Sequence, residues 1–317
     1  MSEQRIYDFM GRRRLAAIGS VLLLIVAIGS LATKGLVLGL DFTGGTQIEV
    51  GYQQAAELKV VRSALEQGGF KNPVVVHFGT EQDVLIRLQE QQETISSENA
   101  EGEPKVALSD KVMTVLKVAN PAVELRRIEY VGPQIGEELR DDGGLGMLAA
   151  LAVVMLYVAI RFQYKFSIAA VSALVHDVII TLGFFSLFNV EFDLTVLAAV
   201  LAVIGYSLND TIVVSDRIRE NFRLLRVAEA SEVINESLTQ TLGRTIITSL
   251  TTLLVLFALF FIGGELIHNF SIALIVGVAV GTYSSIYVAA NILLTMNISR
   301  EDLMPTEKEG AEFDGLP

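Results

Sequence analysis

The 317-residue chain contains no cysteine, which excludes disulfides, thiolate metal sites and cysteine nucleophiles. Its three histidines, His77, His176 and His268, lack the spacing of a metal-ligand motif. No glycine-rich phosphate loop of the GxxxxGKS or GxxxxGKT type occurs, so the chain has no visible site for using ATP. The net charge of −12 argues against a nucleic-acid-binding surface.

Long apolar runs dominate what is present. Hydrophobic residues make up 51% of the chain and the mean hydropathy is +0.50, as expected for a protein with several membrane spans. Runs long enough to cross a hydrocarbon core of about 30 Å are Leu15–Thr33, Gly143–Ile160, Phe166–Phe188, Leu194–Val214, Ile246–Ile262 and Phe270–Met296. The predicted fold class is therefore a polytopic α-helical membrane protein with six transmembrane helices.

The first run follows a polar N-terminus that ends in Arg12, Arg13 and Arg14. Ser30–Ala32 resembles the small-residue site at which a signal peptide is cleaved. The apolar stretch is longer than the core of a typical signal peptide, which favours an uncleaved anchor. We therefore predict a first membrane helix, with cleavage as the alternative.

Residues 34–142 predict a separate α+β domain between the first two spans. Gln47–Val50 alternates with the period of a strand, and Leu58–Leu65 repeats with helical spacing. Further strands are predicted at Val74–Phe78, Asp83–Leu88 and Val123–Tyr130, and a second helix at Leu108–Ala119. The resulting βαββαβ order is the ferredoxin-like arrangement. A mobile acidic loop is expected at Gln89–Pro104.

Positive charge is distributed unevenly among the connections between spans. Lysine or arginine occurs at Arg161, at Lys165 and repeatedly between residues 217 and 244, whereas residues 189–193 and 263–269 contain none. By the positive-inside rule, both termini are cytoplasmic and the α+β domain lies outside. The predicted divisions are a cytoplasmic N-terminus with the first helix (1–33), the periplasmic domain (34–142), the remaining bundle (143–296) and a cytoplasmic tail (297–317). An outer domain without cysteine is consistent with a bacterial envelope.

The long cytoplasmic connection has a helical pattern of its own. Small and apolar residues recur at helical spacing through Val233, Ser237, Leu238 and Thr241. We predict an amphipathic helix near residues 217–244 that lies on the inner membrane surface and runs into the fifth span.

Asn209 and Asp210 place an amide and a carboxylate inside the fourth apolar run, before charges arrive in bulk at Asp216 and Arg217. A carboxylate at this depth costs about 2.5–3.5 kcal/mol on insertion scales, so it usually faces the bundle interior or a water-filled path. We interpret Asp210 as a proton-carrying residue. The alternative is that it reaches the nearby interface or caps a neighbouring helix.

Two further polar groups are candidates for the same path. Arg244, Thr248 and Thr251 share one face of the fifth span by their spacing, although such hydroxyls are also common at helix contacts and Arg244 could be an interfacial anchor. Asp177 in the third span is a second carboxylate that could relay a proton to Asp210 or simply fix packing.

Small residues recur every fourth position in the last span, at Ala273, Gly277, Gly281, Ser285 and Ala289. Such a ridge lets another helix approach closely. We therefore assign Gly277, Gly281 and Ser285 to helix packing, on this chain or on a partner.

Several motifs resemble the SecF family, a branch of the RND transporter superfamily. They are Gly39–Val50, Val131–Gly136, Gly205–Asn221, Thr239–Thr252 and Gly277–Ala289, and together they extend over nearly the whole chain in order. The resemblance implies six spans and an outer ferredoxin-like domain. It also implies a transport subunit of the bacterial inner membrane rather than an enzyme.

The same resemblance implies partners and a mechanism. The expected partners are SecD, the SecYEG channel and the translocating unfolded polypeptide, with YajC and YidC as further candidates. Protons are the expected coupling ion, with no other cofactor and no metal. In the family, a charged pair in the fourth and fifth spans belongs to the proton path, and its positions match Asp210 and Arg244 here.

Two other classes of function remain open from the sequence. A small-molecule exporter of the RND type would need a substrate pocket, for which the short outer loops offer little beyond the single domain. An intramembrane aspartyl protease would need two aspartates in two spans. Its usual GxGD signature is missing, because the sequence ending at Asp210 is SLND.

Overall fold

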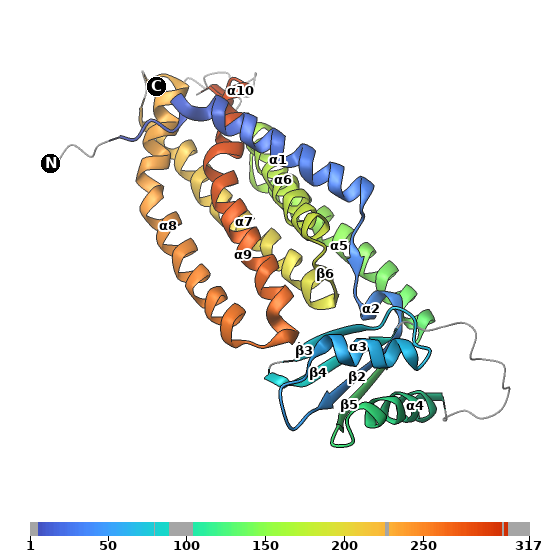
Figure 1. Cartoon of the computed structure of the whole chain (residues 1–317). Coiled ribbons are helices and arrows are strands. Elements are labelled where there is room, and N and C mark those ends of the chain that lie inside the picture. Colours follow the sequence, from blue (N-terminus) through green and yellow to red (C-terminus); the bar gives the residue numbers. More distant parts are fainter. Residues whose placement is uncertain (1–5, 79, 89–103, 226–227, 300, 304–317) are drawn as a thin grey trace, which may run out of the picture.

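The computed structural model describes residues 6–78, 80–88, 104–225, 228–299 and 301–303. Long helices form an elongated bundle that carries a smaller α/β domain at one end (Figure 1). The start of α1 and the short helix α10 lie at the opposite end of the bundle. We call these two ends the domain end and the terminal end.

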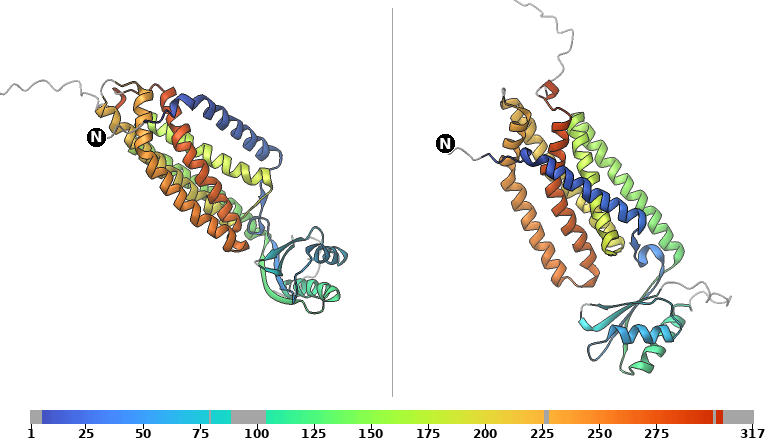
Figure 2. Two further views of the ribbon diagram at one scale, coloured as in Figure 1. Left: turned by 60° about the vertical axis from the view of Figure 1, so that its left-hand side comes forward. Right: turned by 45° about the horizontal axis from the view of Figure 1, so that its top comes forward.

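The bundle helices agree with the predicted number of spans: six helices in the described part of the chain are long and apolar enough to cross a membrane. They are α1 (Arg13–Thr33), preceded by the 3-10 turn Met10–Arg12, then α5 (Pro133–Arg161), α6 (Tyr164–Phe188), α7 (Leu194–Leu224), α8 (Ala230–Ile262) and a last span. The last span consists of α9 (His268–Ser284), a π-helical segment (Ser285–Ala289) and α10 (Ala290–Thr295). Figure 2 shows these helices side by side from two further directions.

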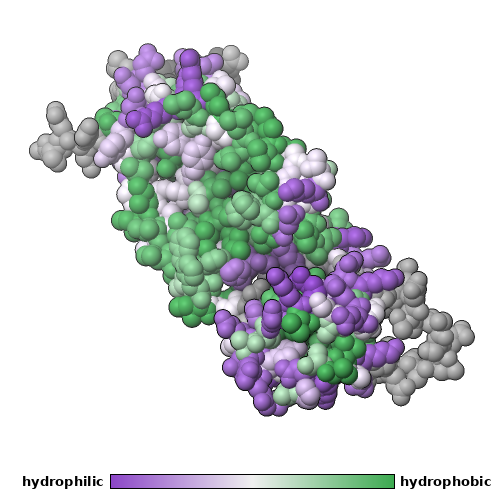
Figure 3. Space-filling model, in the orientation of Figure 1, coloured by the Kyte–Doolittle hydropathy of each residue, from purple (hydrophilic) through white to green (hydrophobic). Residues whose placement is uncertain are grey.

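Helices α6 and α7 form the inside of the bundle. In their most apolar 18-residue windows, 61% of α6 and 50% of α7 is buried, against 17% of α1, 6% of α5 and 17% of α8. The outer helices therefore present apolar side chains to their surroundings, which Figure 3 shows as a broad hydrophobic surface along the bundle. In a membrane, this surface faces lipid or another protein.

Helix α5 begins at Pro133, whereas the sequence predicted a span from Gly143 and a domain that extends to Asp142. A proline is favoured at the first helical position because the missing N–H has no intrahelical partner there. The charged residues between Pro133 and Asp142 form the first turns of the same helix, on the domain side of the apolar segment. Hydropathy marks where the apolar part begins, and the helix starts before it.

The amphipathic helix predicted near residues 217–244 is divided between the end of one helix and the start of the next. Helix α7 continues to Leu224, and α8 begins at Ala230 and runs without a break to Ile262. The apolar face that includes Val233 and Leu238 is buried within the bundle instead of lying on a membrane surface. The Asn221 side chain donates to Ser237 Oγ over 2.8 Å, which ties the ends of α7 and α8 together.

The α/β domain has the predicted order of elements. It comprises β2 (Gly45–Gly51), α3 (Leu58–Gln67), β3 (Val74–Phe78), β4 (Thr80–Leu88), α4 (Pro104–Ala119) and β5 (Glu124–Val131). The four strands form an antiparallel sheet in the order β3-β4-β2-β5. The predicted loop at residues 89–104 lies outside the described residues, apart from Pro104, which begins α4.

Alternation along the strands explains the core of this domain. Ile48 and Ile86 point from the sheet into one apolar cluster with Leu65 of α3 and Leu116 of α4, and all four side chains are buried. Successive strand residues point to opposite faces, so the intervening residues Gln47 and Arg87 lie on the other face.

A short element connects the domain to the bundle. Strand β1 (Val37–Leu38) follows α1 and pairs in parallel with β6 (Glu191–Phe192), which lies between α6 and α7. The helical turn α2 (Leu40–Thr43) comes next and ends at Gly44, where φ is +70°. A Cβ on Gly44 would lie 2.8 Å from Cα of Pro133, so glycine allows the two chain connections of the domain to approach each other.

Candidate functional site

Asp210 lies on the buried side of α7, with 9% of its surface exposed. Thr245 of α8 donates its hydroxyl to Asp210 Oδ1 over 2.7 Å, and Ser285 of the last span donates to Oδ2 over 2.6 Å. Both carboxylate oxygens are thus bonded from neighbouring helices. The Asp210 side chain therefore points into the bundle and does not extend toward the membrane surface.

Asp177 lies on α6 and is fully buried. Ser207 of α7 donates to Asp177 Oδ2 over 2.5 Å and Ser284 of the last span donates to the same oxygen over 2.7 Å. The neighbouring His176 places Nδ1 2.9 Å from Asp177 Oδ1. A second carboxylate therefore lies inside the bundle with its own set of hydroxyl donors.

The hydrogen-bond donors of the two carboxylates are close neighbours along the chain. Ser284 and Ser285 are consecutive, and they donate to Asp177 and Asp210 respectively. On α7, Ser207 lies one turn before Asp210, so the helix that carries one acid donates to the other. The π-helical segment begins at Ser285, and such π-bulges are frequent at functional sites. We call these two aspartates and their hydroxyl partners the acid cluster.

The hydroxyl protons of the last span each have two acceptors within reach. Ser285 Oγ lies 3.0 Å from the carbonyl oxygen of Thr282, in addition to Asp210. Ser284 Oγ lies 3.1 Å from the carbonyl oxygen of Gly281, in addition to Asp177. A hydroxyl has one proton to donate, and a protonated carboxyl becomes a donor itself. Protonation of either acid can therefore be matched by rotation of a serine hydroxyl toward its own helix.

The polar contacts continue from His176 toward α1. The His176 ring stacks with the Tyr283 ring at a centroid separation of 6.4 Å, and its Nε2 is a buried atom without a hydrogen-bond partner in the described part of the chain. Tyr283 donates its hydroxyl to the carbonyl oxygen of Ala16 over 2.7 Å, and Ser20 Oγ lies 3.0 Å from the same hydroxyl. Polar groups thus reach from the centre of the bundle to its first helix.

The predicted row on α8 does not face Asp210 within this chain. Arg244, Thr248 and Thr251 are exposed, and Arg244 forms no ion pair with any described residue. The Thr248 hydroxyl donates to the carbonyl oxygen of Arg244 over 2.9 Å, on its own helix. The next residue, Thr245, faces inward instead, because one residue turns a helix by about 100°. Asn209 is likewise exposed.

The small-residue ridge lies against α7. A Cβ on Gly277 would collide with the side chain of Val203, and one on Gly281 would lie 3.1 Å from Cβ of Ser207. Ser285, assigned to the same ridge, is fully buried and bonds Asp210 as described. The close approach therefore occurs inside this chain, and it brings the serines of the last span to the acids of α6 and α7.

Sequence reasoning missed Ser207, Thr245 and Ser284 as partners of the acids. Single hydroxyls are frequent on membrane helices, so type alone does not distinguish them. Their spacing offered one signal: Ser207 lies three residues before Asp210, and Ser284 lies next to the ridge residue Ser285.

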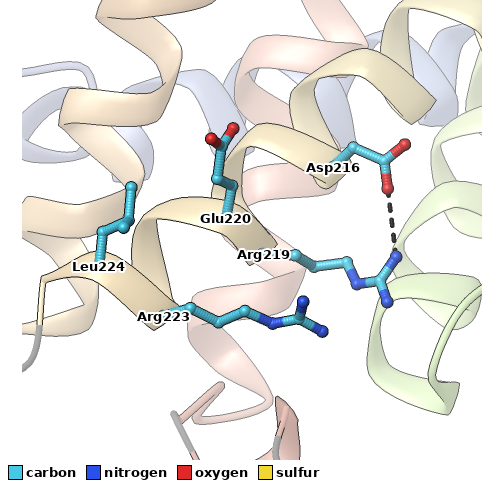
Figure 4. Close-up of a pocket in the computed structure, with 5 residues that line it drawn as sticks. All are labelled: Asp216, Arg219, Glu220, Arg223 and Leu224. Carbon is cyan, nitrogen blue, oxygen red and sulfur yellow. Dashed lines mark hydrogen bonds and ion pairs between the residues drawn. The ribbon is translucent and has the colours of Figure 1, made fainter.

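A charged hollow lies at the terminal end of α7, with a volume of about 280 Å³ and a lining of Asp216, Arg219, Glu220, Arg223 and Leu224 (Figure 4). Arg219 donates to Asp216 over 3.1 Å, and Arg161 of α5 donates to the other oxygen of that carboxylate over 3.2 Å. The charges in this hollow largely compensate one another, so it does not resemble a site for a charged substrate.

Among the described residues, no group of three or more histidine, cysteine, aspartate or glutamate side chains is arranged to hold a metal ion. What the acid cluster can do is hold protons on two carboxylates and exchange hydrogen bonds among hydroxyls. Ionisable residues inside a membrane bundle commonly form proton relays. The fold and the site together define a multi-pass helical membrane protein with a buried acid cluster and one α/β domain outside the bundle.

Comparisons with known proteins identify the family. The model for the C-terminal region of the protein export membrane proteins SecD and SecF matches residues 111–299, and the model for the SecD/SecF GG motif matches residues 29–56. The chain belongs to the SecD/SecF family of protein export membrane proteins. The resemblance noted in the sequence motifs is thereby confirmed.

Relatives named protein translocase subunit SecF match along nearly their whole length. The relative from Pseudomonas aeruginosa is 54% identical over 310 residues, 97% of each chain. That from Vibrio alginolyticus is 47% identical over 320 residues, covering 100% of this chain and 99% of its own. The crystal structure of SecDF, a translocon-associated membrane protein from Thermus thermophilus, matches with a TM-score of 0.79 and 38% identity. The match covers 94% of this chain and 39% of that longer one.

Proposed function

We propose that this chain is a SecF-type subunit of the protein-export machinery, which works with SecD to drive late steps of export across the bacterial inner membrane with the proton gradient. The observation that carries the proposal is the acid cluster: two buried carboxylates whose hydroxyl donors include consecutive serines of one span. Relatives called protein translocase subunit SecF and a solved structure called translocon-associated support the same assignment.

Charge supports an orientation with the terminal end in the cytoplasm and the α/β domain in the periplasm. Arg161, Lys165 and Arg217 lie at the terminal end, whereas the connections at residues 189–193 and 263–269 contain neither lysine nor arginine. Protons would then enter from the domain side. One charge that moves through 100 mV releases about 2.3 kcal/mol, enough to bias a two-state element of the bundle.

The proton-carrying role falls first to Asp210, with Asp177 as the second acid. When either acid takes up a proton, its serine donor can turn to a carbonyl of its own helix and accept from the new O–H. Because both serines lie at the start of the π-helical segment, this exchange acts on the backbone of the last span. A proton step would thus alter packing between the last span and α7.

The exposed row on α8 suggests where SecD contributes. Arg244, Thr248 and Thr251 form a polar stripe on an otherwise apolar outer surface, which is costly against lipid. A partner that supplies an acid at this stripe would pair Arg244 and complete the relay. SecYEG and the translocating polypeptide are the further partners of this proposal, with YajC and YidC as candidates, and no enzymatic activity of its own is assigned.

Substitution of Asp210 by asparagine tests the proposal. Asparagine keeps the shape, and its amide oxygen can accept from one of the two hydroxyls of Thr245 and Ser285 while its NH2 group donates to the other. It cannot exchange a proton. We expect normal abundance and normal association with SecD, with loss of gradient-dependent completion of export in membrane vesicles. Export driven by ATP alone should persist, because the ATP-using step lies in another protein. Full gradient-dependent activity at normal abundance would refute the proton-carrying role.

A further inference from the structure

We propose that Arg87 and Glu191 are positioning residues that couple the α/β domain to the start of α7, the helix that carries Asp210. The proposal rests on the proposed function, because it describes how a proton step in the bundle would be transmitted to the domain. No relationship between these two residues is evident from the sequence, in which 104 positions separate them.

On the domain side, Arg87 is held by a row of side chains across the sheet. Its Nη1 group pairs with Glu191, and its Nε donates to Gln47 Oε1 over 2.9 Å. Gln47 in turn donates to Glu129 Oε2 over 3.2 Å. The row runs from β5 through β2 to β4, so a force on the Arg87 guanidinium is carried by three strands of the sheet.

On the bundle side, Glu191 lies in β6, directly before α7. Its carbonyl oxygen accepts from the Asn269 side chain over 3.3 Å, at the start of the last span. The first amides of α7 are capped from the same segment and from α2: Val196 donates to Asp193 over 2.9 Å and Leu194 to Asp41 over 3.0 Å. The loop around Glu191 is therefore bonded to both helices that meet at Asp210.

The Arg87 contact supplies a restraint that the chain connections lack. The two connections of the domain lie next to each other, since Gly44 contacts Pro133 and Gly45 pairs with Val131. Two adjacent attachments leave the domain free to rotate about them. Among the ion pairs of the described residues, Arg87–Glu191 is the one that joins the domain (45–131) to the bundle.

The electrostatics explain why the contact depends on arginine. Burial raises the pKa of the Glu191 carboxyl, and the nearby acids Asp193 and Asp41 act in the same direction, while Arg87 opposes them. Without Arg87, a half-buried carboxylate would face two like charges and no cation. We expect such a carboxylate to leave the domain surface, which would release the contact.

Gradient-dependent export in vesicles that contain the SecD partner tests the coupling. Arg87→Ala and Glu191→Ala should each reduce it by about fivefold or more, the lower range of typical coupling between sites. The charge-exchanged double variant, Arg87→Glu with Glu191→Arg, should recover most of the activity. The control is Arg126→Ala, which removes the ion pair of Arg126 with Asp83 inside the domain, outside the row that holds Arg87, and should leave export unchanged.

Covalent replacement of the ion pair gives a stricter test, because the chain contains no cysteine. Arg87→Cys with Glu191→Cys should be weakly active, and a short thiol-specific cross-linker should restore activity. Normal activity of the single alanine variants would overturn the proposal. Inactivity of the cross-linked pair at normal abundance would also overturn it, since the contact would then have to open.

A readout that does not involve export separates this proposal from the proposed function. Amide hydrogen exchange at the first turn of α7 should rise in Arg87→Ala and stay unchanged in Arg126→Ala. If Asp210→Asn proves fully active, the proposed function fails, and the exchange result still decides whether Arg87 restrains α7. Unchanged exchange in Arg87→Ala would refute the coupling even where export is impaired.

Discussion

Ser284 and Ser285 are neighbours in the chain, yet they donate to different buried acids, Asp177 and Asp210. In a regular helix, the side chains of consecutive residues point in directions about 100° apart. The backbone changes to π-helical hydrogen bonding at Ser285, the position at which one serine points to Asp177 and the next to Asp210. The two carboxylates are therefore not independent. A change at one acid alters the segment that holds the other.

Removal of these hydroxyls is the first prediction. Ser285→Ala leaves Asp210 with Thr245 as its remaining hydroxyl donor, and we expect gradient-dependent export to fall by about tenfold or more, since hydrogen bonds to charged groups contribute about 1.5–3 kcal/mol. Ser284→Ala should have a smaller effect, because Ser207 still donates to Asp177. Export by vesicles at several pH values measures both variants.

Ser271→Ala is the matched control for the serine variants. Ser271 is fully buried on the same span, but its hydroxyl donates to the carbonyl oxygen of Ile267 and to neither acid. If Ser271→Ala lowers export as much as Ser285→Ala, then loss of a buried hydroxyl explains both effects and the acid cluster is not involved.

The second prediction concerns the contact between Gly277 and Val203. Gly277→Leu forces a side chain into Val203 on α7 and should destabilise the protein by about 1–3 kcal/mol, as overpacking usually does. We expect reduced abundance of the folded chain, measured by thermal unfolding in detergent. Gly144→Leu on α5, where nothing lies within 4 Å of the added Cβ, is the control and should be nearly neutral.

Partial relief in a double variant would show that the collision is the cause. Gly277→Ala should be milder than Gly277→Leu, and Val203→Ala should improve the stability of Gly277→Ala by making room. Equal stability of Gly277→Leu and Gly144→Leu would contradict the close packing of the last span on α7.

The third prediction separates stability from function at Arg244. This side chain is exposed and forms no ion pair among the described residues, so Arg244→Met should leave the thermal stability of the isolated chain unchanged. In vesicles with the SecD partner, the same variant should lose gradient-dependent export. Arg244→Lys keeps the charge but loses the planar guanidinium, so we expect partial activity. Loss of stability of the isolated Arg244→Met chain would indicate an internal role instead.

The fourth prediction is a pH dependence at Glu191. Burial raises the pKa of this carboxyl in the docked structure, so the docked structure binds the proton more tightly than an exposed glutamate does. The proton-linked part of the Glu191 contribution to stability is therefore fully present below the ordinary glutamate pKa and is lost as pH rises through the raised value. At higher pH the ionised carboxylate still pairs with Arg87. Glu191→Gln cannot titrate and supplies the reference.

Thermal unfolding of both proteins across the acidic to neutral range measures this dependence. The stability of the natural chain relative to Glu191→Gln should fall as pH rises. A relative stability that rises with pH would mean that the attraction to Arg87 outweighs burial and that the pKa of Glu191 is lowered instead of raised.

The sequence predicted the parts of the fold that depend on local pattern. Alternation at Gln47–Val50 and helical spacing at Leu58–Leu65 found β2 and α3, because each element must bury one face. The pattern at Val233 and Leu238 was equally clear. It shows that the helix has an apolar face, but it does not show what packs against that face. The neighbour proved to be protein instead of the membrane surface.

The sequence was sufficient to predict the two aspartates of the acid cluster, but not the hydroxyl groups that donate hydrogen bonds to them. Asp210 and Asp177 stand out because carboxylates are rare in apolar runs. Their partners depend on helix rotation, and the choice between Arg244 and its neighbour Thr245 is a matter of one residue. Contact between Arg87 and Glu191 depends on how the domain docks, which no local pattern encodes.

The bonds of α1 have a consequence for how the chain is made. Ser30 bonds Ser186, 156 residues later, and Ser20 bonds Tyr283, 263 residues later. At about 5–20 residues per second, roughly ten to fifty seconds of translation separate Ser20 from its partner. The first helix can gain its contacts with α6 partway through this time, whereas its bond to Tyr283 has to wait for the last span. Assembly of the bundle therefore ends only when the ribosome has delivered that span.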